Sequence, residues 1–331
     1  MCAVEPSPST TDTEPPQPPG PQAGHAPPDI RSAPAPLVRG EPVRIADGVH
    51  VIPDNRVPLV PNIGIVVGDD AALVIDTGAG PRNGAYVLDQ AKRLAGDRRL
   101  YLTTTHFHPE HAFGAQVFKG VATIVCNRGQ RDELCRKGAG YLDMFRGLGP
   151  HIAAQLEGVE FVDPDIVHDG RAEIDLGGHR ATLRAVGPAH TASDQTVLID
   201  DSVLFGGDLF ETRMFPIAPY FPPHDTDIDA HRWITVLDQL LTLDAGIVVP
   251  GHGEVTDSSL LRDVRDYLRH VRDETERLRA TGVPADEAAA VLEKAVRARW
   301  ATWENPEWIS FTVHAFYQEG HQAGRRAERP R

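Results

Sequence analysis

A strand-like run, RRLYLTTT at residues 98–105, passes without a break into six residues that contain three histidines and a glutamate. These four side chains are His106, His108, Glu110 and His111. A hydrophobic core would reject them, because a polar group buried without a partner costs free energy. A solvent-exposed loop would gain nothing from such a run. The fold must therefore end a strand here, at a polar site that uses these side chains.

The chemistry of this cluster indicates metal binding. Imidazole and carboxylate groups are the ligands that zinc takes when thiolates are absent. His106 and His108 are two positions apart, so a strand end would point both rings the same way. Pro109 suits the start of a helix, where its missing N–H is not needed. Glu110 and His111 would then lie on the first helical turn.

Three polar residues elsewhere are candidates to complete the site. They are His190 in AVGPAHTASDQ, Asp208 in VLFGGDLF and His252 in IVVPGHGEV. Each follows an apolar, strand-like run and lies near glycine or proline, as is typical where backbone bends tightly around a site. We expect these strand ends to meet the first cluster in space.

The chain divides into three parts by composition and periodicity. Residues 1–40 are rich in proline, serine, threonine, glycine and alanine, which predicts a disordered tail. Residues 41–256 mix strand and helix patterns, and residues 257–331 form a helical extension that we expect to pack on the same domain. Hairpin-like and crossover connections both occur. This favours an α/β fold of two mixed sheets packed together with helices outside.

Five motifs resemble those of the metallo-β-lactamase-fold hydrolases. They occur in the family's order, as IDTG at Ile75–Gly78, HFHPEH at His106–His111, and then His190, Asp208 and His252. The resemblance covers about Val43 to Glu254. It implies an αββα sandwich of two mixed sheets, helices on the outer faces, and two adjacent metal positions at one edge.

The same resemblance implies a role for each motif residue. His106, His108 and His190 would hold the first metal ion, His111 and His252 the second, and Asp208 would bridge the two. Asp76 would support the metal-binding loop by hydrogen bonding. The implied cofactor is Zn2+, as one or two ions, with iron as an alternative.

Glu110 departs from the family pattern, which has aspartate at this position. Glutamate carries one more methylene, so its carboxylate reaches about 1.5 Å further. Glu110 could bind the second metal ion after a shift of the loop, leave that position weak, act as a base on a metal-bound water, or only cap the helix. We favour ligation.

The metal ligands and the resemblance together predict a zinc-dependent hydrolase. It would use a metal-bound hydroxide to cleave a small carbonyl substrate, which is a lactone, thioester, ester or β-lactam. One alternative is an iron-dependent oxygenase or persulfide-type member of the same superfamily. Another is a metal-binding protein without catalytic activity.

A loop after Asp208 is the candidate substrate-binding segment. Residues 210–227, FETRMFPIAPYFPPHDTD, contain four prolines and so cannot form one long helix. Phe215, Tyr220 and Phe221 could line an apolar pocket, and Tyr220 could donate a hydrogen bond to an oxyanion. The alternative is that these rings only pack the loop onto the domain. With Glu110 and Asp208, Tyr220 completes the predicted catalytic residues.

The charge balance limits the partners. Lysine and arginine number 33 against 47 aspartates and glutamates, a net charge of −14, which argues against nucleic acid and anionic membranes as partners. No apolar run approaches the ~20 residues of a membrane helix, and no signal peptide is visible. We therefore expect a cytoplasmic protein that acts on a small molecule, with a homo-oligomer left open.

Overall fold

The computed structural model describes residues 33–221 and 225–327. Residues 1–32 of the expected tail lie outside this part of the chain. Residues 33–40 form no helix or strand. They nevertheless contact the domain, because the N–H of Val38 donates to the side chain of Asn83, whose own amide donates to the carbonyl of Pro36.

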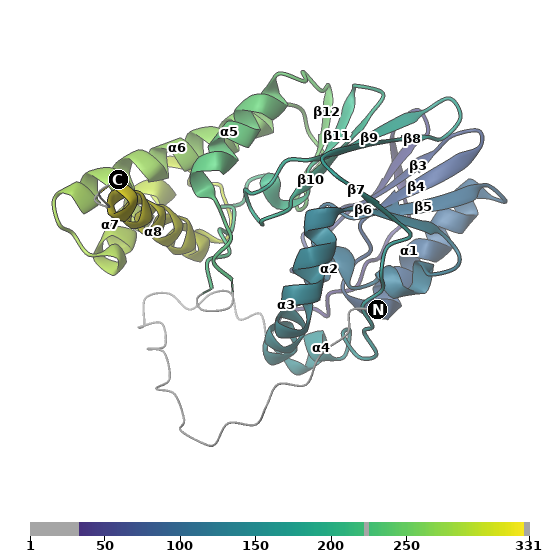
Figure 1. The fold of residues 1–331 in the computed structure, drawn as a ribbon, viewed down its shortest axis with the longest axis horizontal. Coiled ribbons are helices and arrows are strands. Elements are labelled where there is room, and N and C mark those ends of the chain that lie inside the picture. The colour runs from purple at the N-terminus through teal and green to yellow at the C-terminus, as the bar shows by residue number, and fades with distance from the viewer. Residues whose placement is uncertain (1–32, 222–224, 328–331) are drawn as a thin grey trace.

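Two sheets form the centre of the molecule (Figure 1). The first has the order β1-β2-β3-β4-β5-β6-β7 and the second the order β12-β11-β10-β9-β8. The strands of the first sheet are β1 (Val43–Ala46), β2 (Val49–Ile52), β3 (Ile63–Val67), β4 (Ala71–Ile75), β5 (Arg99–Thr103), β6 (Thr123–Asn127) and β7 (Ile166–His168). Those of the second are β8 (Arg171–Asp175), β9 (Arg180–Ala185), β10 (Gln195–Ile199), β11 (Val203–Phe205) and β12 (Ile247–Val249).

Both sheets are mixed, as the sequence predicts. Strands β1 to β4 pair antiparallel, whereas β4 to β7 pair parallel. In the second sheet β8 to β11 are antiparallel neighbours and β11 pairs parallel with β12. Strand β7 was not expected. It has three residues, of which only His168 is buried. The alternation of apolar residues that marks other strands is therefore missing.

Helices cover the outer faces. They are α1 (Gly80–Ala95), α2 (Pro109–Ala112), α3 (Arg128–Gly147), α4 (Pro150–Ala153), α5 (Ala230–Leu241), α6 (Ser259–Ala280), α7 (Ala285–Arg299) and α8 (Ile309–Ala327), with 3-10 turns η1 (Ala115–Phe118), η2 (Gly207–Leu209) and η3 (Pro306–Trp308). The expected break in the helical stretch 128–156 falls between α3 and α4. No helix in the described ranges 33–221 and 225–327 is long and apolar enough to cross a bilayer.

The core consists of apolar layers on the two faces of the sheets. Alternation of apolar residues along the strands predicts such layers. Between the sheets, Val51 and Leu73 of the first sheet share a cluster with Leu183 and Phe205 of the second. On the outer side of the first sheet, α1 buries Val87 and its neighbours against β3, β4 and β5. Burial of such side chains stabilises the fold by about 1.5–3 kcal/mol each. This is the αββα arrangement.

Of the C-terminal helices, α6 and α8 pack on α5, and α7 packs on α6 and α8. Trp233 of α5, Val264 of α6 and Val248 of β12 belong to one buried cluster. His231 of α5 connects two further helices, with Nδ1 at 2.5 Å from Glu319 of α8 and Nε2 at 3.2 Å from Glu276 of α6. In Figure 1, helices α6, α7 and α8 reach out to one side of the sandwich.

Candidate metal centre

Three strands of the second sheet end at the edge where the motif residues lie. Strands β9 and β11 both pair antiparallel with β10, and β11 pairs parallel with β12, so β9, β11 and β12 run in the same direction. Their carboxyl ends meet at one edge of the second sheet. His190, Asp208 and His252 each follow one of these ends, which is why residues distant in sequence come together.

His106 and His108 differ in one respect from the expectation that they lie on a strand end. Strand β5 ends at Thr103, and both histidines lie in the bend between β5 and α2. The bend forms because Thr105 binds Asp76 twice, through its N–H at 2.7 Å and its hydroxyl at 2.9 Å. Glu110 and His111 lie on α2, as predicted.

The seven predicted ligands form two groups that share one residue. Within each group, one nitrogen or carboxylate oxygen per residue lies within 4.8 Å of the others, and all described residues of both groups except His252 are buried. The groups are His106, His108, His190 and Asp208, and Glu110, His111, Asp208 and His252.

Asp208 faces both groups with different oxygens. Its Oδ2 lies 3.7 Å from Nε2 of His106 and 3.8 Å from Nε2 of His190. Its Oδ1 lies 3.2 Å from Nε2 of His111 and 3.7 Å from Nε2 of His252. A carboxylate in this position can bind two cations at once.

The motif glycines make room for this carboxylate. A Cβ on Gly251 would lie 2.0 Å from Oδ1 of Asp208, so only glycine allows the His252 loop to pass there. Gly207 has φ +54°, and a Cβ there would lie 2.5 Å from the hydroxyl of Thr105. Glycine tolerates both demands. The GD and GH motifs therefore follow from close approach of two loops.

The outer nitrogens of four histidines are held by hydrogen bonds. Nδ1 of His111 donates to Asp76 at 2.9 Å, and Nδ1 of His106 donates to the hydroxyl of Thr105 at 3.1 Å. The remaining two donate to backbone carbonyls, His190 to Ile217 at 3.1 Å and His252 to Val60 at 2.9 Å. Such bonds fix the ring orientation and leave each Nε2 free to face the centre.

The atoms that face the centre fit a bound cation. Nε2 of His106 and His111, Oε2 of Glu110 and Oδ1 of Asp208 are buried without a hydrogen-bond partner in the described part of the chain. Buried polar atoms without partners are rare in folded proteins and call for an explanation. A metal ion in each group supplies one, and the imidazole and carboxylate donors suit zinc or iron.

Burial and neighbouring charges set the protonation of the site. Burial lowers the pKa of His106 and of His108 well below the usual range, and lowers the pKa of His190 to about 4. These rings are neutral at pH 7, as metal ligands must be. Burial opposes ionisation of Asp208, but His111 and His252 outweigh it and hold the pKa of Asp208 well below its usual range.

Two residues next to the centre were missed by sequence reasoning. Glu211 is 1% exposed, its Oε2 has no partner among the described residues, and burial together with Asp208 raises its pKa well above the usual range. Tyr141 of α3 stacks on His108, with ring centroids 5.0 Å apart. The only sequence signal for Glu211 was its position three residues after Asp208.

The loop after Asp208 lies near the centre but packs mainly against other elements. Phe215 is fully buried beside Tyr267 and Trp303 of the C-terminal part, and Phe221 contacts Phe311. Tyr220 is partly buried against the same cluster. These contacts favour the packing interpretation for Phe215 and Phe221.

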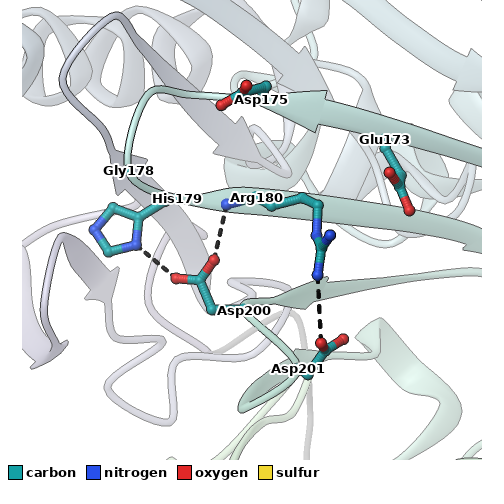
Figure 2. A pocket seen from close by; sticks show the side chains of 7 residues that line it. All are labelled: Glu173, Asp175, Gly178, His179, Arg180, Asp200 and Asp201. Atoms are coloured by element: carbon teal, nitrogen blue, oxygen red, sulfur yellow. Dashed lines mark hydrogen bonds and ion pairs between the residues drawn. The ribbon is translucent and has the colours of Figure 1, made fainter.

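A surface depression elsewhere has no part in this centre. It is lined by Glu173, Asp175, Gly178, His179, Arg180, Asp200 and Asp201 (Figure 2). Arg180 begins β9 and Asp200 follows the end of β10, so the depression lies at the opposite edge of the second sheet. Its charged groups pair with each other, His179 with Asp200 and Arg180 with Asp201.

Comparisons with known proteins agree with this geometry. The family model described as the metallo-beta-lactamase superfamily matches residues 56–252. A linear primary-alkylsulfatase of Pseudomonas sp. (strain ATCC 19151) is 23% identical over 259 residues, which are 67% of this chain and 48% of that protein. Acyl-coenzyme A thioesterase MBLAC2 of Homo sapiens is 27% identical over 208 residues, 58% of this chain and 72% of that protein.

Solved structures show the same fold. The sec-alkylsulfatase Pisa1 from Pseudomonas sp. superposes with a TM-score of 0.66 and 16% identity, covering 84% of this chain and 50% of that chain. The DIM-1 metallo-beta-lactamase gives a TM-score of 0.54 and 16% identity, covering 71% and 98%. The chain thus spans about half the length of the alkylsulfatases that it matches. Both named sequence relatives are hydrolases.

Proposed function

The chain belongs to the metallo-beta-lactamase superfamily, and on that premise we propose that it is a hydrolase that binds two metal ions side by side, with zinc as the expected metal. The observation that carries the proposal is the carboxylate of Asp208, whose two oxygens face separate groups of unpartnered ligand atoms. A structural role alone gives no reason for this arrangement, because buried polar atoms without partners destabilise a fold.

The proposed ligands follow the two groups. His106, His108 and His190 would hold the first ion, and Glu110, His111 and His252 the second, with Asp208 shared by both groups. Bound metal ions supply hydroxide at neutral pH and polarise a carbonyl oxygen. Asp76 keeps the His111 ring in place by accepting from its Nδ1. Tyr220 remains a proposed donor to an oxyanion.

Access to the centre is proposed from the side of His252. Its side chain is 13% exposed, whereas those of His106, His111, His190 and Asp208 are at most 3% exposed. The position that Glu110, His111 and His252 would form is therefore the more accessible of the two, and a substrate would approach it from the side of His252.

A small carbonyl substrate remains the proposed class, with a thioester as the first choice. The thioesterase relative matches over 72% of its own length, so most of that protein has a counterpart in this chain. A sulfate ester is the second candidate, because the alkylsulfatase relative matches over 67% of this chain. The iron-dependent alternative remains, since histidine and carboxylate ligands also suit iron.

Elemental analysis of the purified full-length protein, together with a substrate panel, tests the proposal. We expect two zinc ions per chain and turnover of an acyl thioester or a lactone that a chelator abolishes and added zinc restores. A β-lactam and a primary alkyl sulfate complete the panel. Bound iron together with oxygen consumption would support the oxygenase alternative. A protein that shows no turnover of any substrate would support the alternative without catalytic activity.

The exchange Glu110→Asp tests ligation by Glu110. Aspartate keeps the charge and is the residue that the family pattern places here, so we expect hydrolysis and affinity for the second ion to stay within about tenfold of wild type, below the 10- to 100-fold range of disturbed metal sites. Glu110→Gln, which removes the charge, should lower the affinity for the second ion more than Glu110→Asp does. A Glu110→Asp protein with both ions bound and no turnover would instead indicate a base.

A further inference from the structure

Helix α3 and the loop after Asp208 each touch one imidazole of the first metal group. The ring of Tyr141 on α3 stacks on His108 at an interplanar angle of 25°. The loop presents the carbonyl of Ile217, which accepts a hydrogen bond from Nδ1 of His190 at 3.1 Å. The two imidazoles meet at the centre, with Nδ1 of His108 at 3.2 Å from Nε2 of His190.

A buried carboxylate joins the helix to the loop. Asp225 accepts a hydrogen bond from the hydroxyl of Tyr141 through Oδ2 and one from Nζ of Lys137, at 2.8 Å, through Oδ1. All three side chains are buried. The contacts run from His108 through Tyr141 to Asp225. Backbone hydrogen bonds then join Asp225 to Phe221, at 2.7 and 2.9 Å, on the segment whose Ile217 carbonyl accepts from His190.

A second connection ties α3 to the segment that carries His190. Glu133, paired with Lys137 at 2.7 Å, accepts a hydrogen bond from the hydroxyl of Ser193. Asn127, the N-cap of α3, donates to the backbone carbonyl of Ser193 at 3.1 Å. The helix thus holds His108 by a ring contact and the His190 segment by hydrogen bonds.

We propose that Tyr141 and Asp225 are positioning residues for the first metal ion, which hold the imidazoles of His108 and His190 at the separation that the ion requires. The stacked ring of Tyr141 resists rotation of the His108 imidazole. Through its backbone hydrogen bonds to Phe221, Asp225 holds in place the loop whose Ile217 carbonyl orients His190. Groups that orient a metal ligand set its affinity, and their loss costs 10- to 100-fold.

The effect should be larger for the first ion. Two histidines of the second group are oriented by other contacts, from Asp76 to His111 and from Val60 to His252. Neither contact involves α3 or the described residues of the loop, 215–221 and 225–227. Because α3 also contacts α2, which carries Glu110, loss of the Tyr141–Asp225 hydrogen bond should weaken the first position more than the second.

The test is zinc affinity, measured by chelator competition on the full-length protein; it rests on the metal-binding part of the proposed function. In a His252→Ala background, which weakens the second position, Tyr141→Phe and Asp225→Ala should each lower the affinity of the remaining ion by at least tenfold. Because each variant removes the Tyr141–Asp225 hydrogen bond, by loss of the donor or of the acceptor, the double variant should bind no more weakly than the worse single one. Asp225→Ala leaves Lys137 paired with Glu133.

The matched control is Tyr317→Phe. Tyr317 of α8 is buried, and its hydroxyl donates to the carbonyl of Val283 at 2.8 Å. The control should lower the melting temperature without changing zinc affinity. If wild type binds two ions and Tyr141→Phe binds them as tightly as Tyr317→Phe, this inference is overturned while the proposed function stands. A wild-type protein that binds no ion overturns the proposed function as well.

Discussion

Replacing Asp208 with alanine is expected to remove both metal ions at micromolar concentrations and to lower kcat/KM by more than about a hundredfold, beyond the range for residues that only support a ligand. The reason is that Asp208 belongs to both ligand groups, through Oδ2 beside His106 and His190 and through Oδ1 beside His111. No other described residue faces both groups. Metal content and hydrolysis, measured on the same preparation, check this.

The control for this variant is Asp200→Ala. Asp200 also accepts two hydrogen bonds, from Nδ1 of His179 at 2.6 Å and from the N–H of Arg180 at 2.8 Å, but at the other edge of the sheet. It should keep both ions and the full rate. An Asp208→Ala protein that retained two tightly bound ions would contradict the bridging assignment, even if its activity had fallen.

The sequence could predict that these seven residues come together, because strand ends and glycines leave a signal in the sequence itself. Apolar runs mark β11 and β12, and the polar residue after each run marks the edge that they share. Gly251 carries additional information, because its missing side chain is required by the carboxylate of Asp208. Residue type, spacing and local backbone demand all agree at these positions.

The residues that support the proposed ligands could not be predicted in the same way. Tyr141 lies on a helix whose pattern of apolar residues has no feature that separates a ring over His108 from a ring in the core. Its partner Asp225 is 84 positions away in a proline-rich loop. Such contacts depend on how α3 and the loop pack in three dimensions, and no periodicity encodes that. Glu211 was missed for the same reason.

The position of His106 and His108 shows a related limit. Two imidazoles at i and i+2 fit a strand end, yet β5 stops at Thr103. The tertiary contact of Thr105 with Asp76 bends the chain before the histidines and still brings both rings to the centre. A pattern that predicts which residues come together can therefore be wrong about the backbone that carries them.

Lys137→Met is expected to destabilise the folded state by about 3–5 kcal/mol, the range for a buried ion pair that loses one partner. The ammonium of Lys137 lies 2.7 Å from Glu133 and 2.8 Å from Asp225, and both carboxylates are buried. Burial alone would lower the pKa of Lys137, but these two carboxylates outweigh it and raise the pKa. The lysine is therefore charged, and methionine, of similar length, would leave two acids without a counter-charge.

The unfolding free energy from urea titration, compared with that of Lys119→Met, measures this effect. Lys119 pairs with Asp165 at the same 2.8 Å but on the surface, where an ion pair contributes about 0–1 kcal/mol. Both variants thus remove an ammonium group that lies 2.8 Å from an aspartate. At position 137 this group is buried and pairs with further carboxylates, whereas at position 119 it is exposed and pairs with one. Equal loss of stability in both would mean that Glu133 or Asp225 takes up a proton in the folded Lys137→Met protein. If Asp225 is the acid that takes up the proton, its hydrogen bond with Tyr141 changes as well. Binding of the first metal ion should then be weaker in the Lys137→Met protein.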